Sequence, residues 1–266
     1  MFVISYIRQT IIMKYFISLV LLCFSIALFS QELYNPKYIS SKATPTDSLK
    51  NTDDINLFYL KPIQYIGKFQ KEIVLEYTDS NRYSKILENN YRSKNFKDLN
   101  KEFMTRKYEN IIISVDTSQK TPLEKIDIDT LKISSEEYNA KMDSLYYGKQ
   151  ITHPIPYIKT YYSGFPVTIH NFGNKESIIG FGNNVVLELE ALDKENKWQK
   201  IYPYRYYSCG TGIQFFVLKP NEIATVFEPR LSGDFHTWFR YRLGNIISNE
   251  FEGNINYNYL IHSQAH

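Results

Sequence analysis

The chain has 266 residues, of which 43% are apolar, so it is long enough to bury the core of one large domain or two ordinary ones. Its 31 basic and 28 acidic residues give a net charge of +3, which excludes the broad basic field that nucleic-acid binding needs. It has two cysteines, so the fold must rest on its core and not on a disulfide framework.

The N-terminus has the basic, apolar and then polar layout of a secretory signal peptide. Lys14 precedes an apolar or small run over residues 15–29, and polar sequence follows Ser30. The run has about 15 residues, whereas a membrane span needs ~20. We therefore predict a signal peptide over residues 1–30, cleaved after Ser30, with a retained membrane anchor as the alternative.

Cleavage at this position changes the charge and the cysteine count of the mature chain. It removes Arg8 and Lys14 but no acid, which leaves 29 basic residues against 28 acidic ones. It also removes Cys23, so Cys209 becomes the only cysteine and no internal disulfide can form. We expect an exported protein, periplasmic or extracellular, that does not span the membrane after cleavage and binds no nucleic acid.

Two regions precede the C-terminal half. Residues 31–54 are polar and show little apolar periodicity, which predicts a flexible arm. Residues 55–148 predict a small α+β region, because short apolar runs at 72–77 and 111–115 favour strands while helical spacing recurs over 83–91 and 96–103.

A third helix is better marked at the end of this region. Ser134 and Glu137 form a capping box, and Gly148 can supply the left-handed C-cap. Tyr138, Met142 and Leu145 share one helical face. Residues 149–164 contain two prolines and are expected to form a linker or a first strand.

Strand patterns dominate from residue 165 onward. Short runs of alternating apolar residues are separated by turn sequences, at 165–169, 185–191, 198–207, 213–218, 223–227, 235–243 and 251–259. About seven strands at roughly 8 to 12 residue spacing are typical of an antiparallel β-sandwich, which we predict for residues 165–262. A closed barrel is the alternative, and the fold class of the whole chain is mainly β.

The most regular alternation lies in residues 235–243. Phe235, Thr237, Phe239, Tyr241 and Leu243 fall on one face of an extended strand, which predicts a buried face. The opposite face contains the polar and amphipathic residues His236, Trp238, Arg240 and Arg242.

Four motifs in this half of the chain resemble a known kind of domain. They are Phe165-Pro166-Val167-Thr168-Ile169-His170-Asn171, Leu189-Glu190-Ala191 before Lys197-Trp198, Leu218-Lys219-Pro220-Asn221-Glu222, and Gly233-Asp234-Phe235 leading to Arg240-Tyr241-Arg242. Their order resembles immunoglobulin-like sandwich domains of secreted bacterial proteins. The chain departs from that pattern at Asn221, where Gly is usual, at Phe235, where Tyr is usual, and in lacking the inter-sheet cysteine pair.

The resemblance implies a position for the strand at 235–243. It would be the penultimate strand, with residues 185–192 as its neighbour in the sheet. Glu188 and Glu190 would then lie beside Arg240 and Arg242 and form cross-strand ion pairs.

Three patterns are candidates for catalytic or metal sites. Glu188 and Glu190 have the pairing that glycoside hydrolysis uses, but alternating charge is ordinary on the solvated face of an antiparallel sheet. The five histidines show no metal-ligand spacing. Cys209, between a serine and a glycine, would need His170 or His236 to become a nucleophile, and it otherwise packs as a small apolar residue or links two chains. We predict no catalytic residue, metal or cofactor.

The candidate binding residues are aromatic or cationic. Tyr204, Arg205 and Tyr207 lie in an aromatic strip, and His236 and Trp238 lie on the outward face of residues 235–243. Such side chains could contact a protein or a glycan. The predicted function is therefore an exported, non-enzymatic binding or structural module of the cell envelope. The alternatives are an envelope hydrolase, with a site at the domain junction near His153 and Tyr157, and a subunit of an envelope complex.

Overall fold

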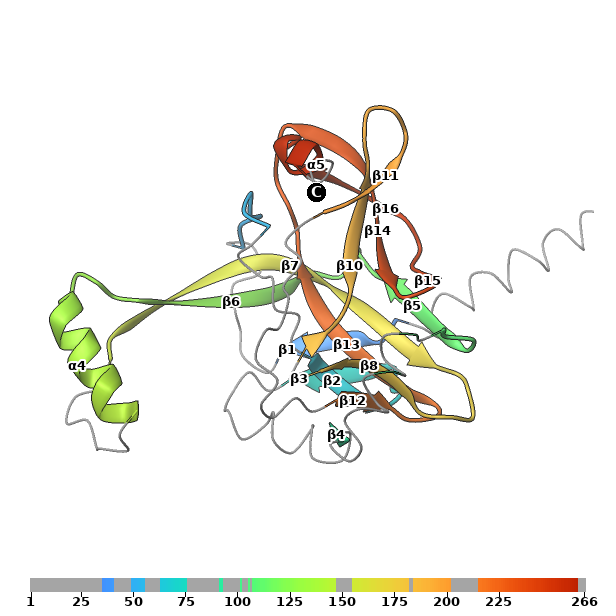
Figure 1. Ribbon diagram of the computed structural model, residues 1–266, viewed down its shortest axis with the longest axis horizontal. Helices are drawn as coiled ribbons and strands as arrows, with labels where there is room; N and C mark the ends of the chain where they lie inside the picture. The colour runs from blue at the N-terminus through green and yellow to red at the C-terminus, as the bar shows by residue number, and fades with distance from the viewer. Residues whose placement is uncertain are drawn as a thin grey trace, which may run out of the picture.

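The computed structural model describes residues 35–40, 49–55, 63–75, 91–92, 101, 105, 107–146, 155–181, 184–201 and 215–262. These residues form a mainly β, largely antiparallel fold, which confirms the predicted fold class at this level (Figure 1). The predicted signal peptide over residues 1–30 lies outside the described residues, so its cleavage stays a prediction.

A central sheet organises the fold around its longest strand, β7 (Tyr157–Asn171). The other strands of this sheet are β2 (Ile63–Lys68), β13 (Glu222–Pro229), β5 (Ile111–Val115) and β6 (Thr121–Ile128). β7 pairs with β13 along one edge and with β5 and β6 in succession along the other. Residues 163–171 of β7 are buried without a break, as expected of a strand that is covered on both faces.

The two faces of β7 contribute to different cores. Phe165, Val167 and Ile169 cluster with Tyr241 and other buried side chains between the sheets. On the opposite face a second cluster contains Ile73, Leu75, Leu123, Ile223 and Phe227. This second cluster lies by the parallel pair of β1 (Lys37–Ser40) and β3 (Glu72–Leu75), from which Ile73 and Leu75 come.

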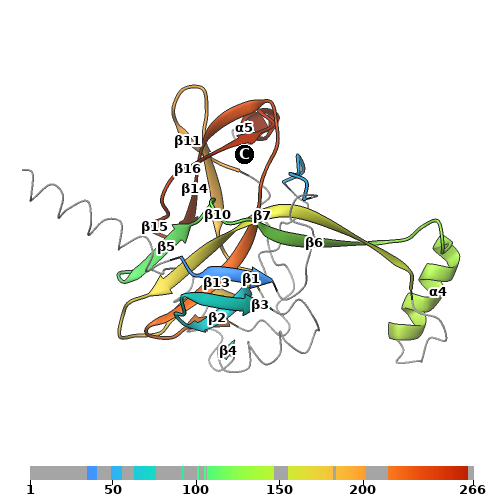
Figure 2. The ribbon, with the colours of Figure 1, turned by 180° about the vertical axis from the view of Figure 1, so that it is seen from behind.

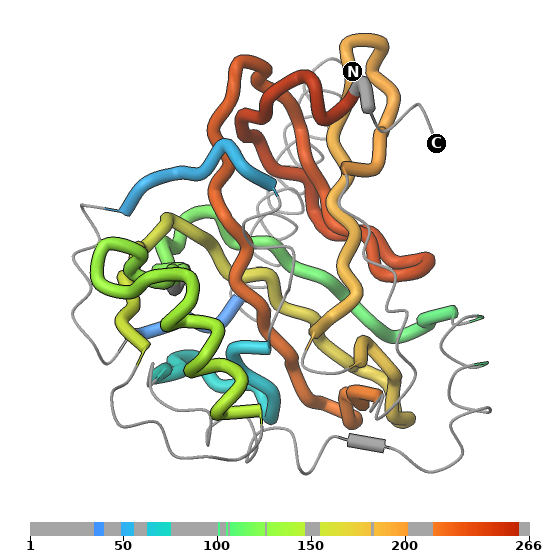
Figure 3. Tube along the Cα trace, turned by 60° about the vertical axis from the view of Figure 1, so that its left-hand side comes forward, coloured from blue at the N-terminus to red at the C-terminus, as the bar shows by residue number. Residues whose placement is uncertain are grey.

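The second sheet contains the most regular strand of the sequence, β14 (Phe235–Leu243). Its other members are β11 (Trp198–Lys200), β10 (Glu188–Leu192), β15 (Ile246–Ile247) and β16 (Phe251–Ile255). In β14 the predicted buried face is confirmed, with Phe235 half-buried at its start and the next four residues of that face buried. In Figure 3 the orange part of the chain runs from β13 in the central sheet to the second sheet.

The strand that neighbours β14 in the sheet was predicted correctly. The place of β14 in the order of strands along the chain was not. β10 pairs antiparallel with β14 so that Glu188 faces Arg242 and Glu190 faces Arg240, as expected. β14 is not the penultimate strand, because both β15 and β16 follow it and pair with it. The chain then ends its described part in helix α5 (Asn258–His262), where the sequence predicted continued strand.

A third, smaller sheet packs against the same core, to which it contributes Ile179, Val185, Phe216 and Leu218. It contains β4 (Tyr91–Arg92), β12 (Phe215–Leu218), β8 (Ser177–Phe181) and β9 (Asn184–Val185) in the order β4-β12-β8-β9. The segment expected as one strand over 185–191 thus divides between two sheets, because β9 pairs with β8 and β10 pairs with β14.

The segments predicted as separate regions contribute to one sheet. β2, β5 and β6 come from residues 55–148, yet they pair with β7 and β13. The expected boundary at residue 165 falls inside β7, so residues 157–164 are part of a strand and not a linker. The polar segment 31–54 differs from a flexible arm in its described parts, since β1 pairs with β3 and Thr52 exchanges backbone hydrogen bonds with Arg230 and Ser232.

Helix α4 (Ser135–Tyr146) begins at the predicted capping box, where the Glu137 amide donates to Ser134 Oγ at 3.2 Å. The helix lies at the end of the long β6–β7 arm, away from the sheets (Figures 1 and 2). Its expected apolar face is not packed, because Met142 and Leu145 are exposed. Two earlier segments, residues 83–91 and 96–103, were also predicted as helices. Within them Tyr91 is in strand β4 and Lys101 is helical, as is Thr105 just beyond, and the other residues of both segments lie outside the described part.

Three turns follow from their residue types. Asn196 and Asn221 adopt φ angles of 57° and 58°, a left-handed conformation that Asn tolerates better than most residues. Asn221 thus fills the position where the resemblance expects Gly. Gly233 leads into β14, and a Cβ there would lie 2.1 Å from the carbonyl carbon of Ile255. Only glycine permits this approach of the two backbones.

The two faces of β14 predict different costs of truncation. Phe239→Ala should lower the free energy of unfolding by about 3 to 5 kcal/mol, since Phe239 is buried and its loss leaves a cavity. Trp238→Ala, one residue away on the solvated face, is the matched control and should cost less than about 1 kcal/mol. Chemical denaturation measures both, and the reverse ranking would show that the faces are inverted.

The burial of His170 predicts that the free energy of unfolding falls at acid pH. Burial against Phe172 and Phe69 lowers the pKa of His170 to about 4. Between about pH 6.5 and 4 the unfolded chain therefore binds a proton that the folded chain does not, so stability falls by up to roughly 3 kcal/mol as pH drops through this window. Denaturation of wild type and His170→Gln at each pH should show a smaller slope in the variant. An imidazole that titrates near 6.5 by NMR would contradict this prediction.

Candidate functional site

The outer face of the second sheet is the first candidate. We define it as the side of β10, β11, β14 and β16 that points away from the core. Alternation places His236, Trp238, Arg240 and Arg242 on this face, and the register adds side chains from the neighbouring strands. These are Glu188, Glu190, Trp198, Lys200, Glu252 and Asn254.

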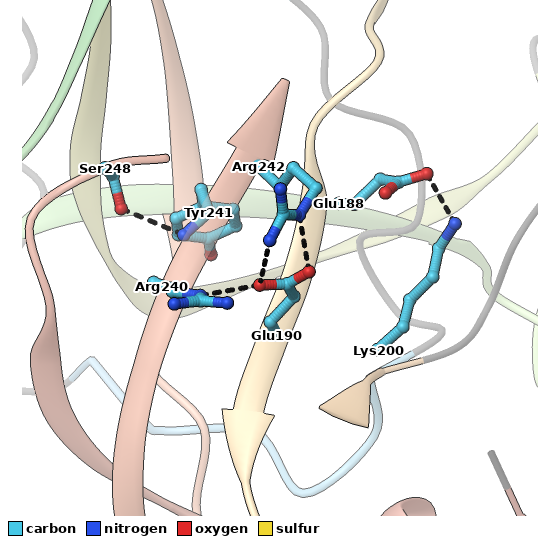
Figure 4. A network of polar contacts seen from close by, with 7 residues as sticks. All are labelled: Glu188, Glu190, Lys200, Arg240, Tyr241, Arg242 and Ser248. Carbon is cyan, nitrogen blue, oxygen red and sulfur yellow. Dashed lines mark hydrogen bonds and ion pairs between the residues drawn. The ribbon is translucent and has the colours of Figure 1, made fainter. Parts of the chain in front are cut away.

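One carboxylate joins two guanidinium groups at the centre of this face (Figure 4). Glu190 Oε2 accepts from Arg240 Nε at 2.6 Å, and Oε1 accepts from Arg242 Nε at 2.6 Å. A third hydrogen bond runs from Arg242 Nη2 to Oε2 at 3.2 Å. Burial favours a raised pKa for Glu190, but the hydrogen bonds from Arg242 and Arg240 outweigh it and hold that pKa below its usual value.

The network extends by two further contacts. The Arg240 guanidinium carbon lies 4.0 Å from the centre of the Trp198 ring, a cation–π distance. Lys200 pairs with Glu188, so the two glutamates are bound by different cations. Glu190 therefore forms the predicted cross-strand ion pairs with Arg240 and Arg242, whereas Glu188 pairs with Lys200 of β11 and not with an arginine of β14.

The other half of the outer face contains both of the predicted binding residues from β14. His236 Nδ1 lies 3.0 Å from Asn254 Oδ1, and His236 Nε2 lies 3.9 Å from Glu252 Oε2. Trp238, opposite Glu252 in the register, is 43% exposed. Strand alternation brings an exposed indole, an imidazole, an amide and a carboxylate together on one solvated surface.

Several other sequence candidates lie elsewhere. Tyr204, Arg205, Tyr207 and Cys209 are outside the described residues, and so is His153. Tyr157, expected near a junction site, is exposed at the start of β7 on the arm that leads to α4. His170 is buried among aromatic rings in the core.

The sequence did not predict a cavity between the central and second sheets. It measures about 180 Å³, and its lining includes the aromatic residues Phe165, Phe239, Tyr241 and Phe251 and the charged residues Glu228, Arg230 and Glu252. Tyr241 Oη donates to Glu228 Oε2 at 2.9 Å, and burial, the Glu228 charge and this hydrogen bond raise the pKa of Tyr241 well above its usual value.

One signal in the sequence could have indicated the buried acid. Glu228 follows Ala224 and Val226 at a spacing of two, so it continues the core-facing side of β13. It is 2% exposed. An acid in phase with buried apolar residues is uncommon and often marks a functional group.

Within the part of the chain that the structure describes, no three His, Cys, Asp or Glu side chains lie close enough to hold a metal ion. No described helix has the length and apolar character needed to cross a membrane.

The ion-pair network predicts unequal effects of two similar substitutions on β10. Glu190→Gln should cost about 2 to 4 kcal/mol, because Arg240 and Arg242 would remain close together without the carboxylate that binds both. Glu188→Gln should cost less than about 1 kcal/mol, since its pair with Lys200 is more exposed to solvent. Urea denaturation at neutral pH compares the two. Equal costs would show that the network does not stabilise the sheet.

In comparisons with known proteins, no family model, no curated protein and no solved structure matches the chain.

Proposed function

We propose that the chain is an exported, non-enzymatic binding module of the cell envelope whose C-terminal strands form an immunoglobulin-like sandwich. Its partner is a protein that contacts the outer face around Trp238. Export is supported by the signal-peptide layout of residues 1–30. The sandwich is supported by the strand spacing and by the pairing of β10 with β14.

The single observation that supports binding is the exposure of Trp238 on a rigid surface. An indole left 43% exposed beside His236, Glu252 and Asn254 resembles the aromatic anchors of protein interfaces, which are large, stiff and rimmed by polar groups. The neighbouring network of Glu190, Arg240 and Arg242 holds the strand in place, so little conformational entropy is lost when a partner binds.

The chemistry of the same face favours binding over hydrolysis. A glycosidase needs two carboxyl groups that face one substrate, one of them free to act as an acid. Here Glu190 is held ionised by Arg240 and Arg242, and Glu188 is paired with Lys200. The carboxylates of Glu188 and Glu190 are thus both engaged in ion pairs between strands.

Truncation of Trp238 should remove binding without unfolding the chain. The tagged full-length chain, expressed in its native cell, is purified from the envelope fraction with its bound proteins, where its mature N-terminus should be Gln31. Trp238→Ala should lower recovery of the specific partner by about 30-fold or more, the effect of losing an interface anchor worth at least 2 kcal/mol.

Leu131→Ala is the matched control, because Leu131 is 94% exposed but lies next to α4, away from the outer face. A partner lost equally from both variants, or from neither, would contradict the assignment of the surface. Release of the bound material by free sugars, or binding to purified glycan, would replace the protein partner with a glycan.

A further inference from the structure

The cavity between the sheets has the size and the lining of a small-molecule site. About 180 Å³ exceeds the roughly 150 Å³ of an engineered apolar cavity that accommodates benzene. Four aromatic side chains from β7, β14 and β16 contribute to its wall: Phe165, Phe239, Tyr241 and Phe251. Phe239 and Tyr241 face the cavity from the side of β14 opposite Trp238, while Glu252 and Asn254 of β16 border both the cavity and the outer face. The ligand proposed below does not rest on the function proposed above.

Two opposite charges line this aromatic cavity from the end of β13. Glu228 and Arg230 are two residues apart, and the Arg230 amide donates to the Ser163 carbonyl at 2.8 Å, which continues the β13–β7 ladder. Residues two apart on an extended strand project to the same side, about 6 to 7 Å from each other. Glu228 and Arg230 thus both contribute to the wall of the cavity from one strand.

Both charged groups are held in place by the protein. Glu228 is 2% exposed and accepts a hydrogen bond from Tyr241. Arg230 Nη2 donates to the carbonyls of Thr117 and Gln119, and its guanidinium carbon lies 5.6 Å from the Phe165 ring centre. Within the described part of the chain, no hydrogen bond engages Arg230 Nε or Nη1, so the N–H groups of these two atoms remain available to an anion while Nη2 is occupied.

We propose that the cavity binds a free α-amino acid with an apolar side chain. Its ammonium group would bind Glu228, its carboxylate would bind Arg230, and its side chain would lie among the aromatic rings. An amine alone would meet the positive charge of Arg230, and a carboxylic acid alone would meet the negative charge of Glu228. A zwitterion matches both charges, and the volume admits one ring or a branched aliphatic chain.

The first test compares ligands on the unaltered mature protein by titration calorimetry. The probes are L-phenylalanine and L-leucine, with phenethylamine and 3-phenylpropionate as analogues that keep only the ammonium or only the carboxylate. We expect at least one of the two amino acids to bind, and phenylalanine to bind about tenfold or more tightly than either analogue. Equal or tighter binding of an analogue would overturn the zwitterion assignment, and no heat with any probe would overturn the site.

The second test assigns the ammonium contact. Glu228→Gln keeps the shape of the side chain and an acceptor for Tyr241, so it should weaken phenylalanine about tenfold or more while 3-phenylpropionate binds as well as before or better. Leu131→Ala should leave every affinity unchanged. If Glu228→Gln does not fold by circular dichroism, the ligand comparison on the wild type still decides. Unchanged phenylalanine affinity in a folded variant would place the ligand elsewhere.

Discussion

The burial of β7 on both faces is the constraint on which the rest of the structure depends. Its backbone pairs along both edges, with β13 on one and with β5 and β6 on the other. Side chains from its two faces enter two separate regions of the core, one shared with the second sheet and one by the β1–β3 pair. A strand that is covered on both faces has no solvated side, which accounts for the unbroken burial of residues 163–171.

β14 provides the functional surfaces because its two faces meet different environments. Phe239 and Tyr241 face the core and the cavity, where the buried carboxylate of Glu228 accepts a hydrogen bond from Tyr241. Trp238 and His236 face outward, where solvent screens charge and aromatic area contributes more to binding. One nine-residue strand therefore lies between the two sites that we propose, one for a small zwitterion inside and one for a protein surface outside.

The network around Glu190 shows why the second sheet has one register. A slip of β10 by one residue would turn Glu190 toward the core and move Ala191 to the outer face. The carboxylate would lose Arg240 and Arg242 in a region of low dielectric constant, a cost that no surface contact offsets. The ion pairs thus specify the alignment of the strands in addition to any net stability that they contribute.

The sequence by itself determined the features that depend on neighbours along the chain. Alternation in residues 235–243 assigned the faces of β14, and Ser134 marked the start of α4. The pairing of Glu190 with Arg240 was expected only from the order of motifs that resembles an immunoglobulin-like sandwich. Tertiary structure alone decided the shared central sheet, the docking of β1, the exposure of Met142 and the cavity beside Glu228. Backbone hydrogen bonds between strands are nearly the same for every residue type, so the sequence does not record which distant segment pairs with which. Whether an apolar face is covered, or an acid is buried, depends on where that pairing places it.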